Sequence, residues 1–201
     1  IPEHQGFSTI TMDASFDDWN PVEVEYRDTE GDVFHRDYNG YGGLRYINKS
    51  GRNDIITSKV AVDEKNIYFY AETKDDLTPY TDTNWMLLLI DADNDSSTGW
   101  YGYDYIINKN VLDENRTTIM EYRKNKKDGK WVKISDINYR KNNNKLELEI
   151  PRSILKLNKH PFTFDFKWSD NPKELKDPVS FCTDGDTAPN RRFNYRFIWK
   201  R

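Results

Sequence analysis

Apolar residues in this chain occur in short runs and alternating stretches, separated by polar loops rich in Asn, Asp and Gly. The most apolar run covers residues 86–90. A run this short and this apolar is more typical of a strand buried on both faces than of a helix. It leads into the acidic loop 91–99 and then into a second β-rich segment, residues 103–108. The pattern therefore predicts a strand, an acidic loop, an aromatic cluster and another strand.

Alternation of apolar and polar residues predicts further strands. Residues 145–150 alternate most clearly, and their three aliphatic side chains are expected to point inward. Aromatic residues repeat at every second position in residues 162–168 and 193–199, which predicts an aromatic face on each of two strands. Asp128-Gly129 predicts a hairpin turn. The other predicted strands are residues 9–12, 22–26, 33–36, 55–63, 66–73, 117–123 and 131–135.

The one helix that the pattern predicts covers residues 151–157, because Pro151 suits a first helical position. Trp19 is expected to close one end of the core. Many short strands with almost no helix indicate an all-β fold, namely an antiparallel β-sandwich or jelly roll with at most one short helix. The length of 201 residues suits a single domain over residues 1–201, with residues 1–8 as a lead-in.

Composition narrows the classes of function. The formal net charge of −4 and the pI of about 5.5 argue against a nucleic-acid partner, since such proteins usually carry a basic footprint. Two basic runs, residues 123–127 and 140–145, fall in predicted hairpins and are interpreted as solvated turns. No apolar run approaches the roughly 20 residues of a membrane span. The single cysteine, Cys182, cannot form an internal disulfide and is expected to be a buried thiol.

The acidic loop is a candidate cation site. Asp91, Asp93 and Asp95 have the alternate spacing that hard cations favour, and Asp104 could add a ligand from the following strand. Calcium takes roughly six to eight oxygen ligands, several of which a tight acidic turn can supply. The alternative is a β-turn in which the Asp side chains bond to their own backbone. The same choice is open for two other acidic groups: Asp13, Asp17 and Asp18, and Asp184 and Asp186.

Aromatic residues beside the acidic loop are candidates for binding a sugar. Trp100, Tyr101 and Tyr103 follow the loop directly. Sugar rings can stack their C–H faces on aromatic planes while their hydroxyls bond to Asp, Asn and Arg, so an exposed aromatic cluster suits a glycan. Trp100 could instead pack as part of the core. The further candidates are Tyr80 and Trp85, and a second set made of Trp168, Asp170, Asn171 and Arg192.

Three blocks occur in a recognisable order: ITMDASFDDW, then SKVAVDEKNIYFYAETKDD with WMLLLIDADNDSSTGW, then FDFKWSDN. Together they resemble the family 9 carbohydrate-binding modules over about residues 9–197. No single block is specific, and the resemblance rests on their order and spacing. It implies a sandwich domain appended to a secreted polysaccharide-degrading enzyme, with structural calcium.

The sequence departs from that family at the sugar site. Family members hold a terminal sugar between two tryptophans, but the first of those places falls near Tyr80 and Thr81 and the second near Thr187. A polar strand residue that helps to hold the sugar falls at about Ile106. The resemblance therefore implies the fold more strongly than it implies the sugar site.

The chain carries no G-x-S-x-G, H-E-x-x-H or glycine-rich phosphate loop. We therefore expect a non-catalytic carbohydrate-binding module of a secreted, periplasmic or cell-surface bacterial protein, which binds an oligo- or polysaccharide. A second hypothesis is a structural sandwich that packs on an attached catalytic domain and has no sugar site of its own. A third is an enzyme of unknown type; a glycosidase, for example, would need two carboxylates in a cleft. The chain begins with Ile1 rather than Met, so an upstream segment is expected to have been removed.

Overall fold

A computed structural model describes residues 3–4, 6–33, 36–124, 128–176 and 178–200, and in these residues the chain is almost entirely β. Within these described residues, helical structure is confined to α1 (Ser180–Thr183) and the single turns η1 (Asp17–Trp19) and η2 (Tyr41–Gly43). The strands are β1 (Glu3–His4), β2 (Tyr26–Arg27), β3 (Arg36–Asn39), β4 (Arg45–Asn48), β5 (Ile55–Val62), β6 (Asn66–Thr73), β7 (Leu87–Asp91), β8 (Tyr105–Val111), β9 (Arg116–Lys124), β10 (Gly129–Asn142), β11 (Lys145–Pro151), β12 (Phe162–Asp170), β13 (Asp186–Ala188) and β14 (Tyr195–Trp199).

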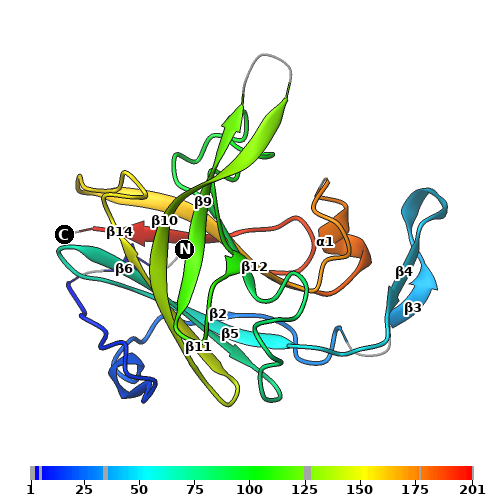
Figure 1. Cartoon of the computed structure of the whole chain (residues 1–201), viewed down its shortest axis with the longest axis horizontal. Coiled ribbons are helices and arrows are strands. Elements are labelled where there is room, and N and C mark those ends of the chain that lie inside the picture. Colours follow the sequence, from blue (N-terminus) through cyan, green and yellow to red (C-terminus); the bar gives the residue numbers. More distant parts are fainter. Residues whose placement is uncertain (1–2, 5, 34–35, 125–127, 177, 201) are drawn as a thin grey trace.

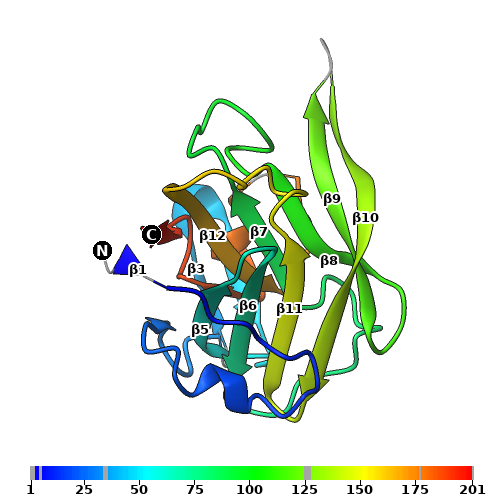
Figure 2. The same ribbon diagram turned by 90° about the vertical axis from the view of Figure 1, so that its left-hand side faces the viewer.

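Twelve strands form one sheet in the order β1-β14-β12-β7-β8-β9-β10-β11-β6-β5-β2, with β13 paired to β12. The sheet curls until its two ends face each other (Figures 1 and 2). Phe69 of β6 thus packs on Phe164 and Phe166 of β12, with ring centroids 5.7 and 5.6 Å apart, although six steps of the sheet separate these strands. The expectation of an all-β sandwich is confirmed, and its two layers belong to one sheet. The pairing is antiparallel except between β1 and β14.

Strand β7 is buried on both faces, as its apolar run predicts. Leu88 and Ile90 point into the main core between the layers. Leu87 and Leu89 point to the other face. There they belong to a second cluster, whose other buried members are Trp100, Tyr103, Ile106 and Phe181. Burial on both faces explains why β7 lacks the alternation of an ordinary antiparallel strand.

Other strand predictions are confirmed in large part. The strands predicted at residues 55–63, 66–73 and 145–150 are β5, β6 and β11, and the two aromatic strands are β12 and β14. The predicted hairpin is β9 with β10, which starts at Gly129, while residues 125–127 lie outside the described residues. Trp19 packs against Tyr70 in a satellite cluster at one end of the molecule, as expected.

Several local predictions are wrong. Pro151 ends β11 and residues 152–156 form turns rather than a helix, because the buried Arg152 guanidinium donates to the carbonyl of Leu157 at 3.0 and 2.9 Å and folds the segment on itself. Residues 9–12 and 22–25 are not strands, and Phe193 lies outside β14 with its side chain 73% exposed. Cys182 is half-buried rather than buried. Residues 3–4 of the expected lead-in pair with β14.

The strand predicted at residues 33–36 lies three residues later, as β3, which pairs with β4 in a separate hairpin; residues 34–35 lie outside the described residues. This hairpin projects from the body beside α1 and the C-terminal loop, residues 189–194 before β14 (Figure 1). No helix among the described residues is long and apolar enough to cross a membrane.

Candidate functional site

The acidic loop after β7 brings three carboxylates together. Asp91, Asp93 and Asp104 each place one carboxylate oxygen within 4.8 Å of the others, in a geometry that could hold a metal ion. The Asp104 carboxylate, from the other end of the loop, is held beside Asp91 and Asp93 because its Oδ2 accepts the backbone N–H of Ala92 at 2.9 Å. The Thr98 hydroxyl bonds to both oxygens of Asp93 at 3.1 Å. Three of the four residues predicted as cation ligands therefore converge.

Asp95 does not join this group. Its Oδ1 accepts the backbone N–H of Ser97 at 2.9 Å and the Ser97 hydroxyl at 2.6 Å, so its carboxylate closes a local turn. This contact is the alternative that the sequence left open, and it corrects the prediction of Asp95 as a ligand. Among the described residues, no three-carboxylate group forms at Asp13, Asp17 and Asp18 either, and Asp18 caps the backbone N–H of Thr11 at 2.8 Å.

Asp91 is the electrostatically costly member of the cluster. Asp91 is only 7% exposed, and its Oδ1 is buried without a hydrogen-bond partner. Burial raises the pKa of Asp91 from 3.8 to about 7, and the neighbouring carboxylates of Asp104 and Asp93 add to the shift. Burial also raises the pKa of Asp104. A buried carboxylate with an unpaired oxygen indicates either a bound proton or a cation.

The aromatic residues after the loop form a tight two-residue turn. Trp100 and Tyr103 exchange backbone hydrogen bonds of 2.8 and 3.1 Å across it. Tyr101 and Gly102 between them have φ values of 53° and 100°, and such left-handed pairs are typical of type I′ turns. The turn points Trp100 and Tyr103 inward against Phe181 and leaves Tyr101 61% exposed at the tip.

Tyr101 lines a groove of about 730 Å³ between this turn and the C-terminal loop. Phe193 is on the other loop, and at 73% its side chain is the most exposed of the large hydrophobic residues that the structure describes. Arg192, a predicted site residue, lines the same groove, as do Arg191 and Asn194. The Asn194 carbonyl oxygen accepts the Tyr103 hydroxyl at 2.7 Å, which leaves its amide N–H groups for another acceptor.

Most of the other predicted sugar-binding aromatics are interior. Trp85 and Trp168 are 1% and 0% exposed, and their indole N–H groups donate to the Thr78 carbonyl and the Ser58 hydroxyl. Trp100 is 7% exposed and packs as core. These positions correct the expectation of exposed stacking rings. Tyr80 is partly buried and packs against the main core.

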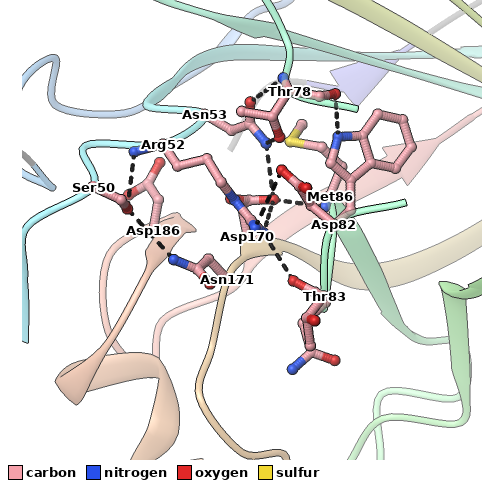
Figure 3. Close-up of polar contacts among 12 residues, drawn as sticks. Ser50, Arg52, Asn53, Thr78, Asp82, Thr83, Met86, Asp170, Asn171 and Asp186 are labelled. Atoms are coloured by element: carbon pink, nitrogen blue, oxygen red, sulfur yellow. Dashed lines mark hydrogen bonds and ion pairs between the residues drawn. The ribbon is translucent and has the colours of Figure 1, made fainter. Parts of the chain in front are cut away.

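Asp170 is a structural anchor rather than a sugar ligand. The Arg52 guanidinium donates to both of its oxygens, with Nε–Oδ2 and Nη2–Oδ1 distances of 2.7 and 3.1 Å. Asn53 and the backbone N–H of Met86 also donate to Oδ1, at 3.0 and 2.9 Å (Figure 3). Burial raises the pKa of Asp170, and the contact with Arg52 opposes that shift. Asn171 lies at the edge of the network, 3.5 Å from the Ser50 hydroxyl.

A second acidic cluster joins segments that are distant in the sequence. Asp28, Asp32 and Asp186 also place carboxylate oxygens within 4.8 Å of one another. Burial raises the pKa of Asp28 to about 6, and the buried Lys167 beside it has a pKa lowered to about 7. The sequence singled out Asp186 but paired it with Asp184, which bonds instead to the Thr183 hydroxyl at 3.2 Å. No local spacing signals this cluster, because its members meet only through the sheet.

Comparisons with protein-family models, with curated proteins and with solved structures found no match to this chain.

Proposed function

We propose that this chain is a non-catalytic carbohydrate-binding module and that its sugar site is the groove between Tyr101 and Phe193. One observation carries the proposal: two large aromatic side chains, 61% and 73% exposed, line a single groove together with Arg192 and Asn194. The volume of about 730 Å³ lies in the range of roughly 300–1,000 Å³ that small-molecule sites occupy.

The chemistry of these side chains suits a sugar. The apolar face of a pyranose can stack on Tyr101 or Phe193, which removes apolar surface of both partners from water. The guanidinium of Arg192 and the amide of Asn194 can donate hydrogen bonds to ring hydroxyls. The buried Tyr103, whose hydroxyl bonds to Asn194, positions that amide. Such a site pairs an apolar stacking surface with a few oriented donors.

We propose calcium as a structural ion at Asp91, Asp93 and Asp104. The unpaired buried oxygen of Asp91 and the convergence of three carboxylates support this proposal. The loop is tied to the aromatic turn, since the backbone N–H of Gly102 donates to the Thr98 carbonyl at 3.1 Å and the Thr98 hydroxyl bonds to Asp93. A cation at the cluster would therefore stiffen the turn that presents Tyr101.

The resemblance to family 9 modules supports a place in a secreted polysaccharide-processing protein, where an attached catalytic domain would act on the bound polymer. A second role is favoured by the two positions that match the family's tryptophans. Thr187 is buried and Tyr80 is partly buried, so neither presents a stacking ring. A sandwich without a sugar site would pack on its catalytic domain as a spacer.

Isothermal titration with oligosaccharides chosen from a glycan array tests the proposal. Replacing both groove aromatics, Y101A/F193A, should weaken binding by about thirtyfold or more, because aromatic anchors carry most of the binding energy at such sites. L112A removes another exposed apolar side chain outside the groove and should bind like the unaltered protein. If folded protein bound no oligosaccharide at millimolar concentration, the spacer role would replace this proposal.

A further inference from the structure

The groove differs in charge from the rest of the molecule. The chain carries a formal net charge of −4. Yet the described residues that line the groove include Arg191 and Arg192 and no Asp or Glu. Local potential rather than net charge determines which ligand a cleft attracts, because low-dielectric walls focus the field of the charges that line them. The groove therefore favours binding of an anion, although the protein as a whole carries a negative net charge.

Both arginines are free to bind a ligand. Among the described residues, neither guanidinium has a hydrogen-bond or ion-pair partner. Most other arginines are paired with a carboxylate, as at Arg196–Asp165 with two contacts of 2.7 and 2.8 Å. The other arginines paired in this way are Arg27, Arg45, Arg52, Arg116 and Arg123.

The backbone fixes where these arginines lie. Arg191 has a φ of 61°, a left-handed conformation that non-glycine residues rarely adopt. Its backbone N–H donates to the buried Thr187 hydroxyl at 3.1 Å, which anchors this turn to β13. Left-handed backbone held by surrounding structure is often found at binding sites. The two side chains therefore project from an anchored turn.

The groove continues past Phe193 toward the β3–β4 hairpin. A second hollow of about 400 Å³ shares Phe181, Arg191 and Phe193 with it and is closed by Tyr38 and Tyr46. Arg36 lines this hollow together with Asp32; Nη2 of Arg36 donates to the Asp32 backbone carbonyl at 2.9 Å, and Nε of Arg36 is buried without an acceptor. A buried donor without a partner indicates a missing acceptor. This second hollow is therefore mixed in charge, and the part free of acidic side chains is the groove beside Arg191 and Arg192.

We infer that the groove binds an acidic glycan, a polymer of uronic acids whose carboxylates pair with Arg191 and Arg192 while its rings stack on Tyr101 and Phe193. This inference rests on the proposed function and narrows it to one class of sugar. Planar guanidinium groups bind carboxylates through two parallel hydrogen bonds, which gives both affinity and orientation. A neutral glycan would leave both guanidinium groups without a counter-charge.

The test titrates the full chain with oligogalacturonates and alginate oligomers, each beside its carboxyl-reduced counterpart, which has the same linkage but no charge. We expect the acidic oligomers to bind more tightly and to weaken as added salt screens the contact. The variant R191Q/R192Q should lose about tenfold or more of this affinity, because each charge-assisted hydrogen bond contributes well above a neutral one. The matched control R116Q/R123Q removes two exposed arginines of β9 and should bind normally.

The outcomes separate this inference from the proposed function. Equal binding of the acidic and reduced oligomers, unchanged in R191Q/R192Q but lost in Y101A/F193A, would overturn the acidic class and leave a sugar site in place. No binding of either form, together with binding of another neutral oligosaccharide, would overturn the acidic class alone, and no binding of any oligosaccharide to folded protein would overturn both. Circular dichroism of each variant shows whether a loss of binding reflects a loss of fold.

Discussion

The buried Oδ1 of Asp91 is the feature that favours a proton or a cation at the acidic loop. The residue ends the apolar strand β7, so its carboxylate starts inside the molecule, with Oδ1 unpaired. The next acidic residues along the chain separate according to local contacts. Asp93 joins the cluster and Asp95 turns away to cap Ser97. Their alternate spacing in the sequence predicted both residues as cation ligands.

Calcium should stabilise the protein through this cluster. A ligand that binds only the folded state raises the melting temperature, so added calcium should raise it and a chelator should lower it. D104N removes a converging ligand and should abolish most of the calcium-dependent shift. D95N removes the same charge from a residue outside the cluster and should keep the shift. Equal loss in both variants, or no response of the unaltered protein, would refute the cluster as the binding site.

Without calcium, Asp91 should make stability depend on pH. Its pKa is about 7 in the folded state against 3.8 ordinarily, so folding favours its protonated form. The free energy of unfolding of the chelated protein should therefore fall as pH rises from about 4 to about 7. D91N lacks the titrating group, and its curve should be flatter than that of the unaltered protein. Urea unfolding at several pH values measures the difference, and parallel curves for the two proteins would contradict the assignment.

At the scale of elements, the Arg52–Asp170 pair joins the end of β12 to the loops before β5 and β7. Asp170 contacts Arg52, Asn53 and the backbone of Met86, and Arg52 reaches the Thr83 carbonyl at 2.9 Å (Figure 3). The loop residues therefore depend on one buried carboxylate for their position. This role explains why a polar residue can be fully buried at the end of an aromatic strand.

R52A should destabilise the fold by about 3–5 kcal/mol, because it leaves the Asp170 carboxylate buried without its partner. The control R45A breaks the exposed Arg45–Asp37 pair, which is worth about 1 kcal/mol or less. Urea unfolding at neutral pH gives both values. A loss in R52A no greater than that in R45A would show that Asp170 is held by its other donors.

Elements with strong periodicity were predictable, and elements that depend on long-range contacts were not. The strands β11 and β12 follow directly from the alternation of apolar and polar residues. The helix predicted at residues 151–157 is absent because Arg152 bonds across the segment and to carbonyls of another loop, the Asp63 carbonyl among them at 3.3 Å. Contacts of that kind override the local preference of a proline for a first helical turn.

At the scale of the whole molecule, the curled sheet brings the candidate groove together from three parts of the chain. The turn at Tyr101 and the loop that carries Phe193 adjoin the neighbouring strands β7, β12 and β14, and the β3–β4 hairpin comes beside them because the sheet closes on itself (Figure 1). Arg192 was predicted as a site residue but was grouped with Trp168 and Asp170, which lie inside the protein. Phe193 was assigned to a strand face. No property of its neighbours in sequence indicated that its ring would be exposed.

Local sequence patterns predicted the all-β class, the doubly buried strand β7 and the three carboxylates that gather after it, together with a fourth, Asp95, that does not. These follow from periodicity and from short-range turn chemistry, both of which act within a few residues. Long-range packing determines which aromatic rings are exposed. It also pairs Asp170 with Arg52 and places the carboxylates of Asp28 and Asp186 close together. Those outcomes depend on which segments the curled sheet places side by side. Apolar burial is non-directional, so local sequence does not select among such pairings.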